Sequence, residues 1–146
     1  MKLSEHFSLD EFTTSQTAAR RRIDNTPTPA VFANLKRIAA LLEQVRAIYG
    51  KPLTISSGYR SPELNAAIGG AKASAHVLGL AADINVPGVS PAVLAREIIK
   101  AGIKFDQLIY EGTWVHIALR AGVSRNEVLT AHFGADGRAT YTSGLA

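Results

Sequence analysis

Three residues in the second half of the chain have the types and spacing to hold a metal ion. His76 and Asp83 lie seven positions apart in Ser-Ala-His-Val-Leu-Gly-Leu-Ala-Ala-Asp, and His116 follows in Trp-Val-His. Two imidazoles and one carboxylate leave one coordination position free for water, as in catalytic rather than structural zinc sites. Gly79 and Ala81 would let the backbone turn so that both donors of the first segment reach one ion. The alternative is a His–Asp ion pair without a metal.

A metal hydrolase also needs a group that takes a proton from water and returns it to the leaving amine, and Glu111 is our candidate. Residues 106–119 predict a β-hairpin in which Gly112-Thr113 fits a two-residue turn with glycine first. Its register places apolar side chains on one face and four site candidates on the other: Gln107, Glu111, Trp114 and His116. A diagonal pair spans about 7–8 Å, which leaves room for a metal and its water. Alternatively, Glu111 is a solvated charge at the hairpin end.

Arg60 is the candidate for contacting a substrate. It follows the turn Ser57-Gly58-Tyr59 and precedes a helix start at Ser61-Pro62. The forked guanidinium of an arginine can hold a carboxylate or a carbonyl group. The alternative for this residue is an ordinary surface arginine.

Several capped segments predict the helices that must support these side chains. The most regular helix covers residues 29–49, where Thr28 can cap the start, Pro29 suits the first turn and Gly50 ends the helix. Apolar residues recur there every three or four positions. Shorter helices are predicted at three more starts: the capping box at 8–11, Ser61-Pro62 and Ser90-Pro91. Residues 15–28 are polar and are expected to end in a loop.

Alternating apolar residues predict strands over residues 52–56 and 80–86. The second strand would bury its even-numbered residues and present Asp83 on the opposite face. Residues 71–75 are small and are expected to form a mobile loop leading into His76. A second hairpin is predicted within residues 124–146, with its turn at an Asp-Gly pair.

Length and composition limit the class of protein. A chain of 146 residues with 47% hydrophobic residues is expected to form one globular domain. Without cysteine, any metal must bind nitrogen and oxygen donors. The start of the chain has no apolar core of a signal peptide, and no apolar run is long enough for a membrane span. We therefore expect a soluble cytoplasmic product that reaches an external target only after release through a holin or another route.

The formal net charge of +4 favours an anionic partner, such as a cell-wall polymer. The one basic cluster, Arg20-Arg21-Arg22, has no interleaved aromatic residues. We therefore expect no nucleic acid among the partners.

Three motifs occur together in this chain: Ser-Ser-Gly-Tyr-Arg-Ser at 56–61, S-x-H-x-x-G-x-A-x-D at 74–83, and Trp-Val-His at 114–116. Together they resemble the zinc D-alanyl-D-alanine carboxypeptidase family, whose relatives include D-Ala-D-Ala dipeptidases and phage L-alanyl-D-glutamate endopeptidases. Segments 6–12 and 23–27 also resemble a branch of that family. The likeness covers about residues 4–119 of a single domain, 1–146, and leaves 120–146 as a C-terminal extension.

The resemblance implies one zinc ion bound by His76, Asp83 and His116, with Arg60 in contact with the substrate or transition state. It places Ser74 beside the metal loop, where it joins Gln107 and Trp114 as an expected substrate-binding residue. It also implies an α+β fold, in which a small antiparallel sheet holds the site and packs against helices.

One position departs from the family pattern. Many relatives carry the catalytic carboxylate three residues before the last zinc histidine, and Thr113 occupies that position here. Either Glu111 serves as the base through the hairpin geometry, or the base lies elsewhere, or the protein is a weak enzyme.

We expect a monomeric zinc metallopeptidase that hydrolyses stem peptides of bacterial peptidoglycan, as a carboxypeptidase or an endopeptidase. A phage or prophage endolysin that degrades the cell wall would suit the small size and basic charge. The alternative, motivated by Thr113, is a non-catalytic zinc-containing module that binds the cell wall or belongs to a phage structure.

Overall fold

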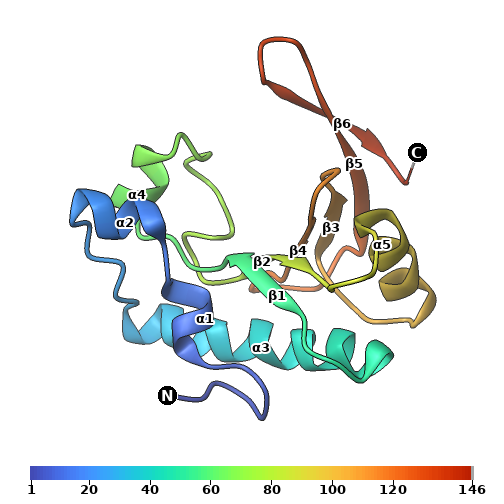
Figure 1. The fold of residues 1–146 in the computed structure, drawn as a ribbon, viewed down its shortest axis with the longest axis horizontal. Helices are drawn as coiled ribbons and strands as arrows, with labels where there is room; N and C mark the ends of the chain where they lie inside the picture. Colours follow the sequence, from blue (N-terminus) through green and yellow to red (C-terminus); the bar gives the residue numbers. More distant parts are fainter. Residues whose placement is uncertain (146) are drawn as a thin grey trace.

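The computed structural model describes residues 1–145 and confirms an α+β fold. Its six strands form one sheet in the order β1-β2-β4-β3-β5-β6 (Figure 1). The strands are β1 (Thr54–Ser57), β2 (Ala81–Asn85), β3 (Gln107–Tyr110), β4 (Val115–Ala118), β5 (Glu127–Phe133) and β6 (Ala139–Ser143). The helices are α1 (Leu9–Thr13), α2 (Gln16–Arg21), α3 (Pro29–Tyr49), α4 (Pro62–Ala67) and α5 (Pro91–Lys100). Within the described residues, no helix is long and apolar enough to cross a membrane.

Helix α3 begins and ends where its caps predict. The Thr28 side chain accepts a hydrogen bond of 3.2 Å from the backbone N–H of Val31, Pro29 is the first helical residue, and Gly50 ends the helix at φ 64°. The helix runs beneath the sheet in Figure 1 and buries one apolar face there. The fully buried residues of that face are Leu35, Ile38, Ala39, Leu42 and Val45.

Strands β3 and β4 have the predicted register, with Ile109 opposite His116 and Tyr110 opposite Val115. Strand β2 lies on the other side of β4 and places Asp83 opposite His116. Because directly paired residues point to the same face of a sheet, Asp83, His116 and Ile109 form one row. The opposite face packs in the core with helices α3 and α5, and its fully buried residues are Ala82, Ile84, Leu108, Val115 and Ile117.

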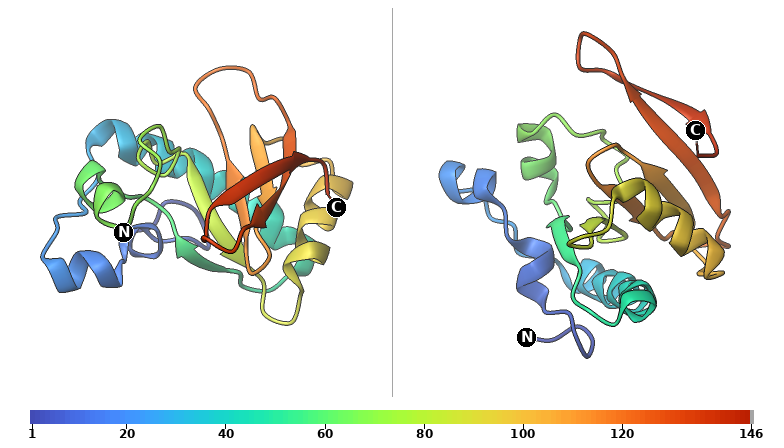
Figure 2. Two further views of the ribbon diagram at one scale, coloured as in Figure 1. Left: turned by 90° about the horizontal axis from the view of Figure 1, so that it is seen from above. Right: turned by 45° about the vertical axis from the view of Figure 1, so that its right-hand side comes forward.

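The C-terminal hairpin forms as predicted, but it also joins the main sheet, which the sequence did not indicate. Strands β5 and β6 are antiparallel, with Ala131 opposite Tyr141. Strand β5 runs parallel to β3 and pairs Leu129 with Ile109. Figure 2 shows the hairpin, in red, extending from the far side of the sheet relative to α1 and α2. Pairing of this kind depends on backbone hydrogen bonds between distant segments, which local patterns do not reveal.

The segment 15–28 ends in a loop as predicted, but it begins with helix α2, which the sequence did not indicate. The Ser15 side chain accepts a hydrogen bond of 3.2 Å from the N–H of Ala18, and Arg22 ends the helix at φ 55°. The helix has only alanines as apolar residues, so no apolar stripe marked it in the sequence.

Candidate metal centre

His76, Asp83 and His116 converge on the face of the sheet opposite α3. The Oδ1 atom of Asp83 lies 3.4 Å from Nε2 of His76 and 3.0 Å from Nδ1 of His116. One donor atom from each residue lies within 4.8 Å of the others. Zinc–ligand bonds of about 2.0–2.2 Å place neighbouring donors of a tetrahedral ion about 3.3 Å apart. The number, chemistry and spacing of the donors therefore fit a zinc ion.

A hydrogen bond to the backbone orients the ring of His76. Its Nδ1 lies 2.7 Å from the carbonyl oxygen of Gly58. A carbonyl only accepts, so Nδ1 donates to it, and Nε2 is the ring nitrogen that faces Asp83 and would bind a metal. The carbonyl of His76 in turn accepts a bond of 3.1 Å from the N–H of Arg60. The turn after β1 and the metal loop thus hold each other in place.

Gly79 allows the metal loop to return toward the sheet. Its φ of +73° is one that side-chain-bearing residues rarely adopt. A Cβ atom there would lie 2.8 Å from Cγ1 and 3.0 Å from the carbonyl oxygen of Val31 in α3. The loop therefore packs directly on the helix, with no room for a side chain at position 79.

The carboxylate of Asp83 is ionised although it is only 6% exposed. Burial works against its charge, but hydrogen bonds from His116 and His76 hold the pKa of Asp83 well below its usual range. A permanently charged carboxylate between two imidazoles suits the binding of a divalent cation.

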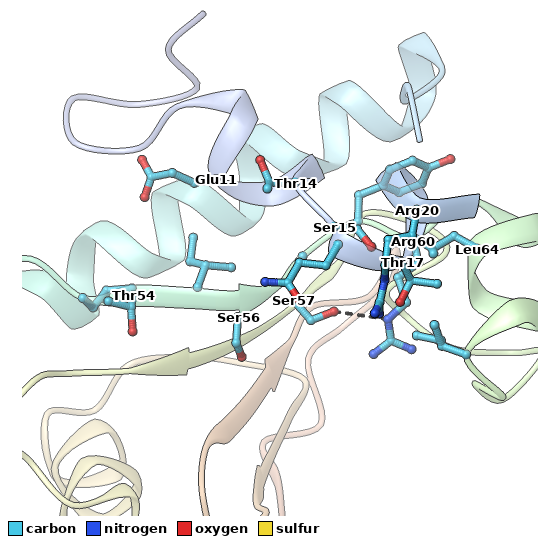
Figure 3. A pocket seen from close by; sticks show the side chains of 16 residues that line it. Glu11, Thr14, Ser15, Thr17, Arg20, Thr54, Ser56, Ser57, Arg60 and Leu64 are labelled. Atoms are coloured by element: carbon cyan, nitrogen blue, oxygen red, sulfur yellow. Dashed lines mark hydrogen bonds between the residues drawn. The ribbon is translucent and has the colours of Figure 1, made fainter. Parts of the chain in front are cut away.

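The guanidinium of Arg60 is held at the edge of the centre by three neighbours. Nε donates to the Ser57 hydroxyl at 3.2 Å, Nη1 donates to the Asn65 side-chain oxygen at 3.1 Å, and Nη2 lies 3.9 Å from Oδ2 of Asp83. Figure 3 shows Arg60 and its hydrogen bond to Ser57. The pocket drawn there is a neighbouring one, which residues of α1, α2 and β1 line together with Arg60. A Cβ on Gly70 would clash with Oδ1 of Asn65, so the chain packs closely around this support.

Glu111 lines the same cavity as the three donors, whereas Thr113 is exposed in the turn. The Trp114 indole N–H donates to Oε2 of Glu111 at 2.5 Å. Burial raises the pKa of Glu111, and the charge of Asp83 raises it further, against the opposing effects of His116 and Trp114. The carboxyl group is thus a possible proton carrier beside the metal donors.

All eight residues proposed from the sequence line one cavity of about 870 Å³. Besides the residues above, Ser74 accepts a bond of 3.2 Å from the N–H of His76, so it shapes the metal loop. The Gln107 side-chain amide donates to Glu127 at 2.8 Å, at the end of the cavity near the C-terminal hairpin.

The sequence did not indicate a second wall of this cavity. Arg120, Arg125, Phe133 and Tyr141 also line it. They come from β5, β6 and the segment leading to them, and Figure 1 shows this hairpin across the β2–β4 strands from α4. The alternating pattern of β5 was visible in the sequence, but not the strand beside which it would lie.

A family model described as peptidase M15 matches residues 5–118. No curated protein matches the chain. The matched span contains the three metal-donor candidates, Arg60 and Glu111, and it ends before β5.

Proposed function

The chain belongs to the peptidase M15 family, a family of zinc-dependent metallopeptidases, and we propose that it hydrolyses stem peptides of bacterial peptidoglycan. One observation carries this proposal: His76, Asp83 and His116 share a cavity with a partly buried carboxylate, Glu111, and a fixed cation, Arg60. A hydrolytic metal site needs those three components, namely an open metal, a proton carrier and a charge-stabilising group.

Each component has a role in the proposed reaction. Zinc held by the three donors would supply a Lewis acid for the scissile carbonyl and lower the pKa of water. Glu111 takes the proton of the attacking water and passes it to the leaving amine. Because Trp114 binds Oε2 of Glu111, Oε1 remains for this transfer. The pKa of Glu111, raised by burial, favours a group that both accepts and returns a proton.

Arg60 stabilises the negative charge that develops on the carbonyl oxygen, or holds a substrate carboxylate. Its bonds to Ser57 and Asn65 fix the guanidinium before substrate arrives. A guanidinium that is already in position does not have to move when the transition state forms. In a partly buried site, it can therefore stabilise the developing negative charge strongly.

The direct test is a digest of purified peptidoglycan, with the released fragments identified by mass spectrometry. We expect release that stops on chelation and returns with added zinc. Free D-alanine would identify a carboxypeptidase, and a cut after L-alanine would identify an endopeptidase. If the zinc-loaded protein bound sacculi of several wall types without releasing fragments, the non-catalytic cell-wall module would replace this proposal.

A further inference from the structure

Two large side chains of the C-terminal hairpin line the catalytic cavity while remaining open to solvent. Phe133 is 55% exposed and Tyr141 is 51% exposed. Both lie beyond residue 118, where the family match ends. Exposed aromatic groups that converge on a polar cavity are typical of surfaces that a ligand covers.

The sheet register explains why these two side chains reach the site. Ile109, in the row of His116, is opposite Leu129 on β5. Ala131 and Phe133 follow Leu129 at two-residue steps on the same face of β5, and Ala131 is opposite Tyr141. Burial raises the pKa of Tyr141, and so does the charge of Glu111, in agreement with this placement.

The hairpin is anchored to the rest of the sheet by a buried carboxylate. Asp106 is 4% exposed and accepts bonds of 2.9 Å from both Nε and Nη2 of Arg125, at the entry to β5. The backbone N–H of Arg125 adds a bond of 3.2 Å to the same carboxylate. Bidentate pairing of this kind fixes orientation as well as distance. The aromatic wall is therefore held at the cavity before substrate binds.

A second arginine lies beside this anchor at the same end of the cavity. Arg120 lies 3.9 Å from Asp106, so two guanidinium groups share one carboxylate. Their side chains are 47% and 51% exposed, and both line the cavity. Glu127 also acts on Arg125, but Nη1 of Arg120 lies beyond hydrogen-bond distance of Asp106 and can receive a carboxylate of a ligand.

We propose that the β5–β6 hairpin is the substrate-recognition wall of the enzyme and selects acidic peptides. Phe133 and Tyr141 pack against the peptide beside the scissile bond, while Arg120 and Arg125 receive a carboxylate of the same peptide. This inference rests on the proposed peptidase function. It names the class of stem peptide preferred, one that bears a free carboxylate near the bond that is cut.

The aromatic part is tested with the double variant F133A/Y141A. A matched control is H132A/T140A, whose residues pair across the same two strands on the opposite face. We expect the first variant to raise KM about 10-fold or more with little change in kcat, because it removes ground-state packing only. Calorimetric binding of an uncleaved peptide, in an E111Q background, should weaken to a similar extent. The control should match the parent in both measurements.

The charged part is tested with two synthetic stem peptides that differ only in one group: a free α-carboxylate or a carboxamide on the D-glutamate residue. We expect the parent to favour the carboxylate, and R120Q to lose most of that preference. R138Q is the control, since Arg138 lies on the same hairpin with a side chain 89% exposed. Thermal unfolding verifies that each variant is folded.

The outcomes separate the two proposals. Suppose that the parent cleaves stem peptides, but that the variants F133A/Y141A and R120Q both behave like their controls. The hairpin inference then fails, and the peptidase function stands. If the zinc-loaded parent neither cleaves nor binds any stem peptide, both proposals fail. A higher KM confined to F133A/Y141A would reject the carboxylate part alone.

Discussion

Glu111 and Thr113 flank Gly112 at the tip of the β3–β4 hairpin, and the hairpin directs them differently. Glu111 pairs with Trp114 through backbone and indole bonds and lines the cavity, while Thr113 is exposed. The carboxylate at position 111 therefore faces the metal donors, and the side chain at position 113 does not line their cavity. This placement supports Glu111 as the proton carrier.

Replacing Glu111 with glutamine should lower kcat by about 10²–10⁴-fold, because the amide cannot take a proton from water. Zinc content should stay at one ion per chain, since Glu111 is not among the donors. Steady-state kinetics and metal analysis measure the two effects. Glu63→Gln, on an exposed position of α4, is the control. A kcat of E111Q within about threefold of the parent would remove Glu111 from the mechanism.

At the scale of elements, the metal loop depends on its contact with α3. Gly79 and Gly69 have similar positive φ angles, +73° and +75°. Only Gly79 has a neighbour that a Cβ would strike, since the space around Gly69 is open to 4 Å. Alanine substitutions at the two positions therefore distinguish the effect of backbone strain from the effect of steric contact with α3.

Gly69→Ala should cost about 1 kcal/mol of unfolding free energy, from the left-handed backbone alone. Gly79→Ala should cost about 2–3 kcal/mol and weaken zinc binding, because the loop must also move away from Val31. Denaturant unfolding and zinc titration measure these effects. Equal losses in the two variants would show that contact with α3 does not position the loop.

The anchor of the C-terminal hairpin predicts a pH dependence. Hydrogen bonds from Arg125 hold the pKa of Asp106 below its usual value, although burial opposes this. A lowered folded-state pKa adds stability above the unfolded value, about 3.9, and that stability is lost as pH falls through the folded-state pKa.

Asp106→Asn should therefore cost about 1 kcal/mol near neutral pH, a modest value because Arg125 is half exposed to solvent screening. The difference from the parent should shrink as pH falls below about 4. Denaturant unfolding of both proteins, at several pH values from neutral to below about 4, measures this difference in unfolding free energy. Asp136→Asn, at the exposed hairpin turn, should have no such effect. A constant difference at every pH would contradict the pairing.

At the scale of the whole molecule, the metal donors join segments that are distant in sequence. His76 lies in the loop before β2, Asp83 on β2 and His116 on β4. An unfolded chain does not hold these groups together, so zinc should bind the native state almost exclusively.

Zinc at about 100 times its Kd should add about 2.7 kcal/mol to the unfolding free energy. For a domain of this size, that shift should raise Tm by about 5–10 °C. Differential scanning calorimetry with zinc and with a chelator measures it. Asp83→Ala should abolish the rise by removing a donor. A Tm that is unchanged by zinc in the parent would contradict the metal assignment.

Local patterns in the sequence were sufficient where the determining contacts are close along the chain. The caps of α3, the β3–β4 register and the pairing of β5 with β6 all follow from neighbouring residues or short turns. Strand alternation likewise assigned the site candidates of the predicted strands to one face. Arg60, Ser74 and His76 lie outside the strands and were named from the motifs and the family resemblance. Family resemblance then linked the separate segments into one metal site.

Contacts between segments that are distant in sequence became known only from the tertiary structure. The fixing of His76 by Gly58, the bracing of Arg60 by Asn65, and the parallel pairing of β5 with β3 involve backbone atoms or folded surfaces that carry no sequence signal. Because backbone hydrogen bonds are the same for every residue type, no local pattern could indicate which strand β5 would join. That pairing places Phe133 and Tyr141 at the cavity.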